Sequence, residues 1–111
     1  MTLELNKIHY GNCFDLLPLI PDASVDAIIT DPPYGVLKGH KIETNVDIPR
    51  FFAECKRVMK PNAFMCFFGQ MPTFTYWMLG AMESGLKYKD HVIWVKRNVS
   101  FWGGLQNKSH A

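Results

Sequence analysis

The sequence predicts an α/β fold in which a partial, mostly parallel sheet is flanked by helices. Two apolar runs without strict alternation, residues 25–30 and 63–68, are typical of parallel strands that are covered on both faces. Residues 48–59 and 74–82 repeat apolar side chains at the i, i+3, i+4, i+7 spacing of helices. Because strands and helices alternate along the chain, we expect parallel pairing.

The composition is that of one small globular domain. The chain has 111 residues, of which 48% are hydrophobic and 20% are charged, so we expect a single domain over residues 1–111. A formal net charge of +2 is compatible with nucleic acid but does not by itself indicate it.

The cysteines and the hydropathy pattern bear on location. The 3 cysteines lack the spacing of metal ligands or of a Cys-x-x-Cys pair. We expect buried, reduced thiols and no metal site, as in a cytoplasmic protein. No run approaches the roughly 18 apolar residues of a membrane span, so the sequence predicts a soluble protein without membrane contact.

The amino-terminal quarter leads into the first long strand. Residues 7–10 form a short strand candidate, after which Asn12 can cap a brief helix that stops near Pro18. The segment 21–24 then turns the chain into the strand at 25–30.

The elements after the first strand begin with a loop over residues 35–44, which has no sustained period. The helix that follows is capped by Asp47 and has Pro49 in its first turn, with Arg50, Glu54, Lys56 and Arg57 facing water. Residues 91–96 are the last predicted strand.

Four residues directly after the strand at 25–30 stand out: Asp31, Pro32, Pro33 and Tyr34. The carboxyl end of a strand is where ligands bind in open α/β sheets. The prolines stiffen the turn and leave its carbonyls free to accept hydrogen bonds. Asp31 adds a carboxylate acceptor and Tyr34 a flat ring, a combination that suits a planar, amine-bearing ring. A rigid Pro-Pro turn without a functional role is the alternative.

At these residues the sequence resembles the DNA amino-methyltransferases, whose signature is Asp/Asn/Ser-Pro-Pro-Tyr/Phe. The resemblance extends over residues 8–13, 57–61 and 92–96, in the order of members that place the catalytic motif before the cofactor motif. It implies a partial Rossmann-like methyltransferase fold that uses S-adenosylmethionine. It also implies that Asp31, Pro32, Pro33 and Tyr34 are catalytic.

The implied reaction transfers a methyl group to the exocyclic amine of a flipped DNA base, with adenine N6 favoured over cytosine N4 because the motif begins with Asp. The carboxylate of Asp31 and the carbonyl of Pro32 accept the amine hydrogens, and Tyr34 stacks on the base. Transfer to cytosine carbon 5 is disfavoured, because it needs a cysteine after a proline. Cys13, Cys55 and Cys66 follow other residues.

The resemblance is weaker for the methyl donor. It implies Asn12 and Asp31 as cofactor contacts, although the family has an acidic residue at the position of Asn12, and helix capping is the simpler role for Asn12. The glycine-rich stretch Asp-Pro-Phe-x-Gly-x-Gly, which forms the cofactor turn in such members, has no counterpart through Ala111. We therefore expect the catalytic part of a domain whose cofactor part is missing or comes from a complementing chain.

Three functions stay open from the sequence. The first is a fragment of a DNA methyltransferase of the restriction–modification kind, possible as a homodimer. The second is an inactive remnant or a nucleic-acid-binding module. The third is a methyltransferase for RNA bases or protein glutamine, whose motif more often begins with Asn.

Overall fold

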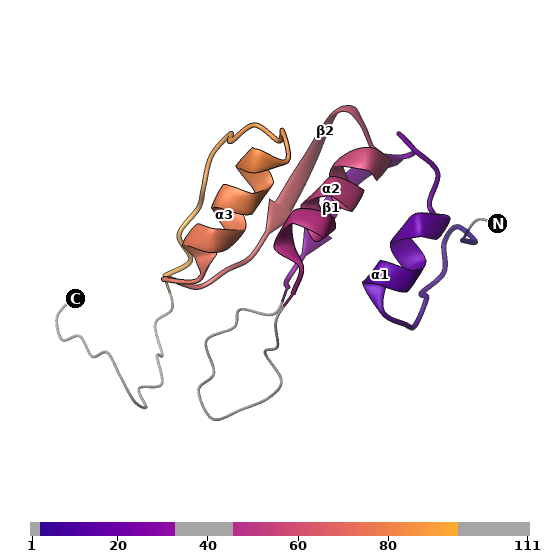
Figure 1. Ribbon diagram of the computed structural model, residues 1–111, viewed down its shortest axis with the longest axis horizontal. Coiled ribbons are helices and arrows are strands. Elements are labelled where there is room, and N and C mark those ends of the chain that lie inside the picture. Colours follow the sequence, from indigo (N-terminus) through magenta and orange to yellow (C-terminus); the bar gives the residue numbers. More distant parts are fainter. Residues whose placement is uncertain (1–2, 33–45, 96–111) are drawn as a thin grey trace, which may run out of the picture.

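The computed structural model describes residues 3–32 and 46–95, whose arrangement is drawn in Figure 1. The elements are α1 (Cys13–Leu16), the 3-10 helix η1 (Leu17–Leu19), β1 (Val25–Thr30), α2 (Ile48–Val58), β2 (Met59–Phe67) and α3 (Phe74–Glu83). The α/β class is confirmed, and the arrangement is compatible with part of a Rossmann-like methyltransferase fold.

The sheet consists of β1 and β2, which run parallel. Ile28 is opposite Met65, Ile29 opposite Cys66 and Thr30 opposite Phe67. The register shifts between Val25, which is opposite Met59, and Ala27, which is opposite Phe64. Because β1, α2 and β2 follow one another in the chain, α2 is the crossover that parallel pairing requires.

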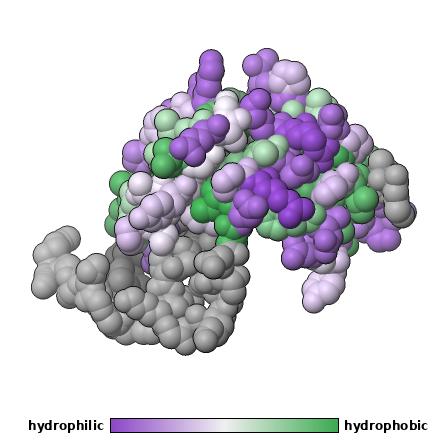
Figure 2. Space-filling view, viewed as in Figure 1, coloured by the Kyte–Doolittle hydropathy of each residue, from purple (hydrophilic) through white to green (hydrophobic). Residues whose placement is uncertain are grey.

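The helix α2 begins and packs as its sequence predicts. The side chain of Asp47 accepts a hydrogen bond from the backbone N–H of Arg50 at 3.2 Å, and Pro49 lies in the first turn. Its apolar stripe of Phe51, Phe52, Cys55 and Val58 is buried. Figure 2 shows hydrophilic side chains gathered over the outer surface of this helix.

The core lies between the two long helices and one face of the sheet. Phe52 is fully buried, with ring centroids 5.9 Å from Trp77 of α3 and 5.3 Å from Phe67 of β2. On the sheet, Ile28 and Met65 pack against the same cluster. Edge-to-face contacts between these rings add to the hydrophobic gain from burying them.

Two predicted strands are absent from the described part of the chain. Residues 7–10 and 91–95 are not strands, and large side chains on both segments, including Ile8, Tyr10 and Val92, are exposed. The physical reason is that a strand needs a neighbour for its backbone N–H and C=O groups. Among the described residues, only β1 and β2 pair.

The prediction that both faces of the sheet are covered is also wrong within the described residues. Ile29 is 76% exposed and Phe64 is 64% exposed on the face away from the helices. The expectation of buried thiols holds for Cys55 alone, because Cys13 and Cys66 are exposed. The predicted loop at 35–44 and the whole stretch after residue 95 lie outside the described residues.

None of the described helices has the length and apolar character needed to cross a membrane.

Candidate functional site at the carboxyl end of the sheet

The site is built on the last residues of β1. Asp31 and Pro32 directly follow Thr30, with Asp31 exposed and Pro32 buried. The backbone N–H of Phe68 donates to the carbonyl oxygen of Thr30 at 3.1 Å. The pairing therefore continues past the end of β2, and both strands end at the same edge of the sheet.

The structure brings together two of the predicted catalytic residues, Asp31 and Pro32, because they are neighbours on the chain. Pro33 and Tyr34 lie outside the described residues. The roles of all of these residues in catalysis therefore stay predictions. What the structure gives is the position of Asp31 and Pro32 at the carboxyl edge, where open parallel sheets bind ligands.

The turn after β2 is fixed by its packing against α3. The carbonyl oxygen of Gln70 accepts hydrogen bonds from the Thr73 hydroxyl and the Phe74 backbone N–H, both at 2.9 Å. A Cβ atom on Gly69 would lie 2.0 Å from Cδ1 of Phe74, so only glycine allows this ring to pack here. Gly69 and Gln70 thus stand at the same sheet edge as Asp31.

Asn12 is a helix cap in this structure. Its Oδ1 accepts a hydrogen bond from the Phe14 backbone N–H at 2.8 Å, as the sequence predicts. Phe14 in turn packs on Phe51, with 6.5 Å between ring centroids, and the Arg50 guanidinium lies 4.5 Å from the Phe14 ring centroid. A contact between Asn12 and a cofactor remains an expectation.

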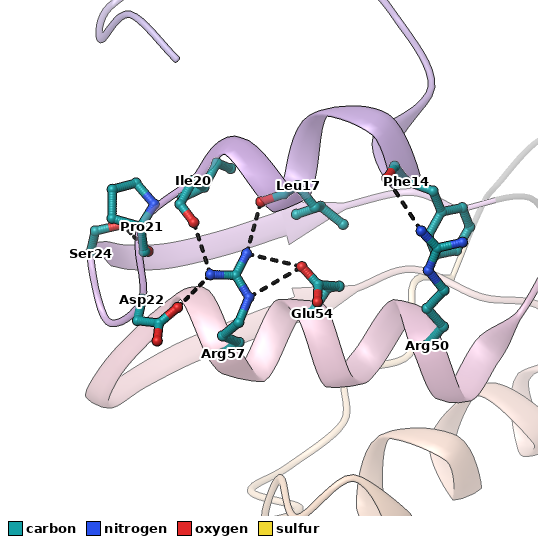
Figure 3. A network of polar contacts seen from close by, with 9 residues as sticks. All are labelled: Phe14, Leu17, Ile20, Pro21, Asp22, Ser24, Arg50, Glu54 and Arg57. Carbon is teal, nitrogen blue, oxygen red and sulfur yellow. Dashed lines mark hydrogen bonds and ion pairs between the residues drawn. The ribbon is translucent and has the colours of Figure 1, made fainter. Parts of the chain in front are cut away.

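Arg57 makes more contacts than the prediction of a water-facing side chain implied. Its guanidinium donates to the carbonyl oxygens of Leu17 and Ile20, both at 2.9 Å. It also pairs with Glu54 at 2.9 Å and with Asp22 at 2.5 Å (Figure 3). The hydrogen bonds that Arg57 donates to these two carboxylates, first to Glu54 and then to Asp22, raise the pKa of Arg57 above its usual value.

These contacts of Arg57 join separate elements of the fold. Arg57 ties η1 and the turn before β1 to α2, and so holds the amino-terminal end of the strand that carries Asp31. Helical spacing alone predicts that the Arg57 side chain faces solvent. The one signal for another role was its place in the run 57–61, which resembles the methyltransferases.

Gly69, at this edge of the sheet, does not offer the room that a cofactor turn needs. A cofactor turn needs a glycine whose missing side chain leaves room for the ligand. At Gly69, that room is filled by the Phe74 ring. Residues 3–32 and 46–95 also contain no cluster of 3 or more His, Cys, Asp or Glu side chains that could hold a metal ion.

Comparison with known families identifies the family of this chain. The model of a DNA methylase family matches residues 25–109, which include β1, the residues after it, α2, β2 and α3. This chain is a member of the DNA amino-methyltransferase family. The resemblance predicted from Asp31 to Tyr34 and the runs around them is thereby confirmed.

Curated relatives are type II methyltransferases. M.BamHI of Bacillus amyloliquefaciens is 25% identical over 95% of this chain and 26% of its own length. M.HinfI of Haemophilus influenzae is 25% identical over 88% of this chain and 29% of its own length. M1.MboII of Moraxella bovis is 50% identical over 36 residues, which are 32% of this chain and 14% of its own length. The chain thus spans less than a third of these relatives, and no solved structure matches it.

Proposed function

We propose that this chain forms the amine-binding part of a DNA methyltransferase that acts on the N6 amine of adenine. The observation that carries the proposal is the position of Asp31 and Pro32 at the carboxyl end of a parallel strand, in a chain of the DNA amino-methyltransferase family. The methyl donor in this proposal is S-adenosylmethionine.

The chemistry follows from the two acceptors. The lone pair of an exocyclic amine is delocalised into the ring, which makes the nitrogen a poor nucleophile. When the Asp31 carboxylate and the Pro32 carbonyl accept its two hydrogens, they favour a pyramidal nitrogen whose lone pair is available to take up the methyl group. The acceptors orient the amine without forming a covalent bond to it.

A base reaches these acceptors only outside the double helix, so the proposal includes a flipped nucleotide. Tyr34 stacks on the extruded ring in this proposal. Adenine is favoured over cytosine because the motif begins with Asp31. We propose cytosine N4 as the second candidate base.

An inactive remnant is the competing function, and one observation is compatible with it: the Phe74 ring fills the space at Gly69, just after β2, so this glycine does not offer room for a ligand. An RNA-base or protein-glutamine methyltransferase is less favoured, because Asp31 departs from the Asn that begins those motifs.

The test is a chimera in which residues 1–111 replace the aligned segment of M.HinfI, with unaltered M.HinfI as the positive control. The chimera is incubated with S-adenosylmethionine and unmethylated DNA, and the nucleosides are identified by mass spectrometry. We expect N6-methyladenine. A chimera that is folded and binds S-adenosylmethionine, yet leaves the DNA unmethylated, would support the remnant; N4-methylcytosine would reassign the base.

A further inference from the structure

We infer that Phe68 is a second stacking residue of the site, which binds the face of the target adenine while Asp31 accepts from its amine. This inference rests on the proposed function and adds a residue that the signature does not contain. It comes from the register of β1 and β2 and from the exposure of the sheet's open face.

The register places Phe68 beside Asp31. Thr30 is opposite Phe67, and the N–H of Phe68 donates to the carbonyl oxygen of Thr30. The next residue of each strand is therefore the next pair, with a strand spacing of about 4.8 Å. Continuing the register by one residue puts Phe68, which directly follows β2, beside Asp31, which directly follows β1.

Alternation places both residues on one face. Along β1 and just after it, Ile29 and Asp31 are exposed, whereas Ile28 and Thr30 are half-buried toward the helices. Along β2, Phe64, Cys66 and Phe68 are exposed, whereas Met65 and Phe67 are half-buried. The carboxylate of Asp31 and the ring of Phe68 thus share the open face at the edge where a ligand binds.

The backbone around Phe68 is held in place by its neighbours. The Phe67 ring lies 5.5 Å from the ring of Phe74, and the Gly69 backbone lies directly against Phe74. The two hydrogen bonds to the Gln70 carbonyl oxygen close the turn on the other side of Phe68. Phe68 itself is 43% exposed and is not part of the hydrophobic core. A partly exposed ring on a well-supported backbone, next to an amine acceptor, is an arrangement that can stack on a base.

Phe64 provides a matched control. It lies on the same face of the same strand, 64% exposed, and it is opposite Ala27 rather than Asp31. Four residues separate it from Phe68, which is about 13 Å along a strand. Both rings would be equally affected if the open face served only as an apolar surface.

The experiment titrates the isotopically labelled chain with deoxyadenosine monophosphate in the millimolar range and follows it by NMR. We expect upfield shifts of the Phe68 ring protons and a shift of the Asp31 amide. Phe68→Leu should weaken binding by about fivefold or more because it keeps apolar volume but loses the ring face. Phe68→Tyr and Phe64→Leu should stay within about twofold of the parent.

Other outcomes overturn the inference in distinguishable ways. If the Asp31 amide responds to the nucleotide while Phe68→Leu binds as well as the parent, Phe68 does not stack and the proposed function stands. Equal losses in Phe68→Leu and Phe64→Leu would mean apolar packing only. A response to S-adenosylhomocysteine but not to the nucleotide would assign the ring to the donor. No response at Asp31 or Phe68 in a sample shown to be folded and monomeric would contradict both proposals. Ring shifts in the unaltered chain keep the test valid if a variant fails to fold.

Discussion

Arg57 occupies a position on α2 where helical spacing predicts solvent, yet its guanidinium is half-buried among backbone carbonyls and carboxylates. Periodicity could not show this, because Leu17, Ile20 and Asp22 come from a segment far earlier in the chain. A planar group with several fixed donors can satisfy such a set, whereas the single ammonium of lysine cannot.

We predict that Arg57→Lys lowers the free energy of unfolding, since the shorter reach of a lysine ammonium leaves the Leu17 carbonyl oxygen or the half-buried Glu54 carboxylate without its donor. Arg50→Lys is the control, because the exposed Arg50 guanidinium only lies over the Phe14 ring and donates to its carbonyl at 3.4 Å. It should cost at most about 1 kcal/mol. Urea unfolding of the two variants measures the difference, and equal losses would contradict the role given to Arg57.

Cys55 gives a prediction about pH. Burial, with smaller contributions from Cys13 and Glu54, raises the pKa of the Cys55 thiol from 9.0 to about 12. The folded state therefore disfavours the thiolate. Stability from this group is fully present below pH 9.0 and is lost as the pH rises toward 12.

We expect the free energy of unfolding to fall more steeply above pH 9.0 in the parent than in Cys55→Ala. Cys66→Ala, at an exposed cysteine, should keep the slope of the parent. Chemical unfolding at a series of pH values measures the three slopes. If Cys55→Ala retains the steep fall, another group is responsible for it.

At the scale of elements, the helices and the two long strands could be predicted because their signals are local. Asp47 and Pro49 mark the start of α2, and the stripe from Phe51 to Val58 marks its buried side. The position of Asp31 at the end of β1 follows from the same local patterns.

What could not be predicted depends on distant partners. Residues 7–10 and 91–95 have the composition of strands, but a strand exists only where a neighbour pairs with it. The proximity of Phe68 to Asp31 likewise needs the register of β1 against β2, which no single run of sequence contains.

The contact between α2 and α3 depends on Gly80, where a Cβ atom would lie 2.3 Å from Cγ2 of Ile48. We predict that Gly80→Ala lowers the free energy of unfolding by about 1 kcal/mol, because overpacking of roughly 2 kcal/mol exceeds the gain in helix propensity of roughly 1 kcal/mol. In an Ile48→Ala background the clash is gone, so the same change should be neutral or stabilising. Thermal unfolding of the double-mutant cycle measures this coupling, and additive effects would contradict it.

At the scale of the molecule, the described part of the chain is a sheet covered on one side only. Residues 7–10 form no strand, so they do not pair with the open edge of β1. Parallel sheets normally have both faces covered, and an edge strand offers unpaired backbone groups. The exposed side chains of Ile29 and Phe64 lie on the uncovered face.

We therefore predict that the isolated chain either self-associates through β1 and this face or has a low free energy of unfolding. Analytical ultracentrifugation over a concentration series measures association. Ile29→Lys should shift any oligomer toward monomer, while Lys87→Ala, on the exposed segment after α3, should not. A stable monomer at high micromolar concentration, with rapid amide exchange at residues 27–30, would contradict the prediction.

The central claim is that Asp31 accepts hydrogens from the amine that receives the methyl group. In the chimera with M.HinfI, we predict that Asp31→Ala reduces methyl transfer by about 100-fold or more while the affinity for DNA stays nearly unchanged. Asp26→Ala is the matched control, because Asp26 is an exposed carboxylate on the same strand that pairs with Lys60 at 2.8 Å, away from the site. The decisive measurement is the single-turnover rate of tritiated methyl transfer in the three proteins. A large loss for Asp31→Ala with a near-normal rate for Asp26→Ala is the predicted result, and a rate for Asp31→Ala within about threefold of the unmutated chimera would contradict the claim.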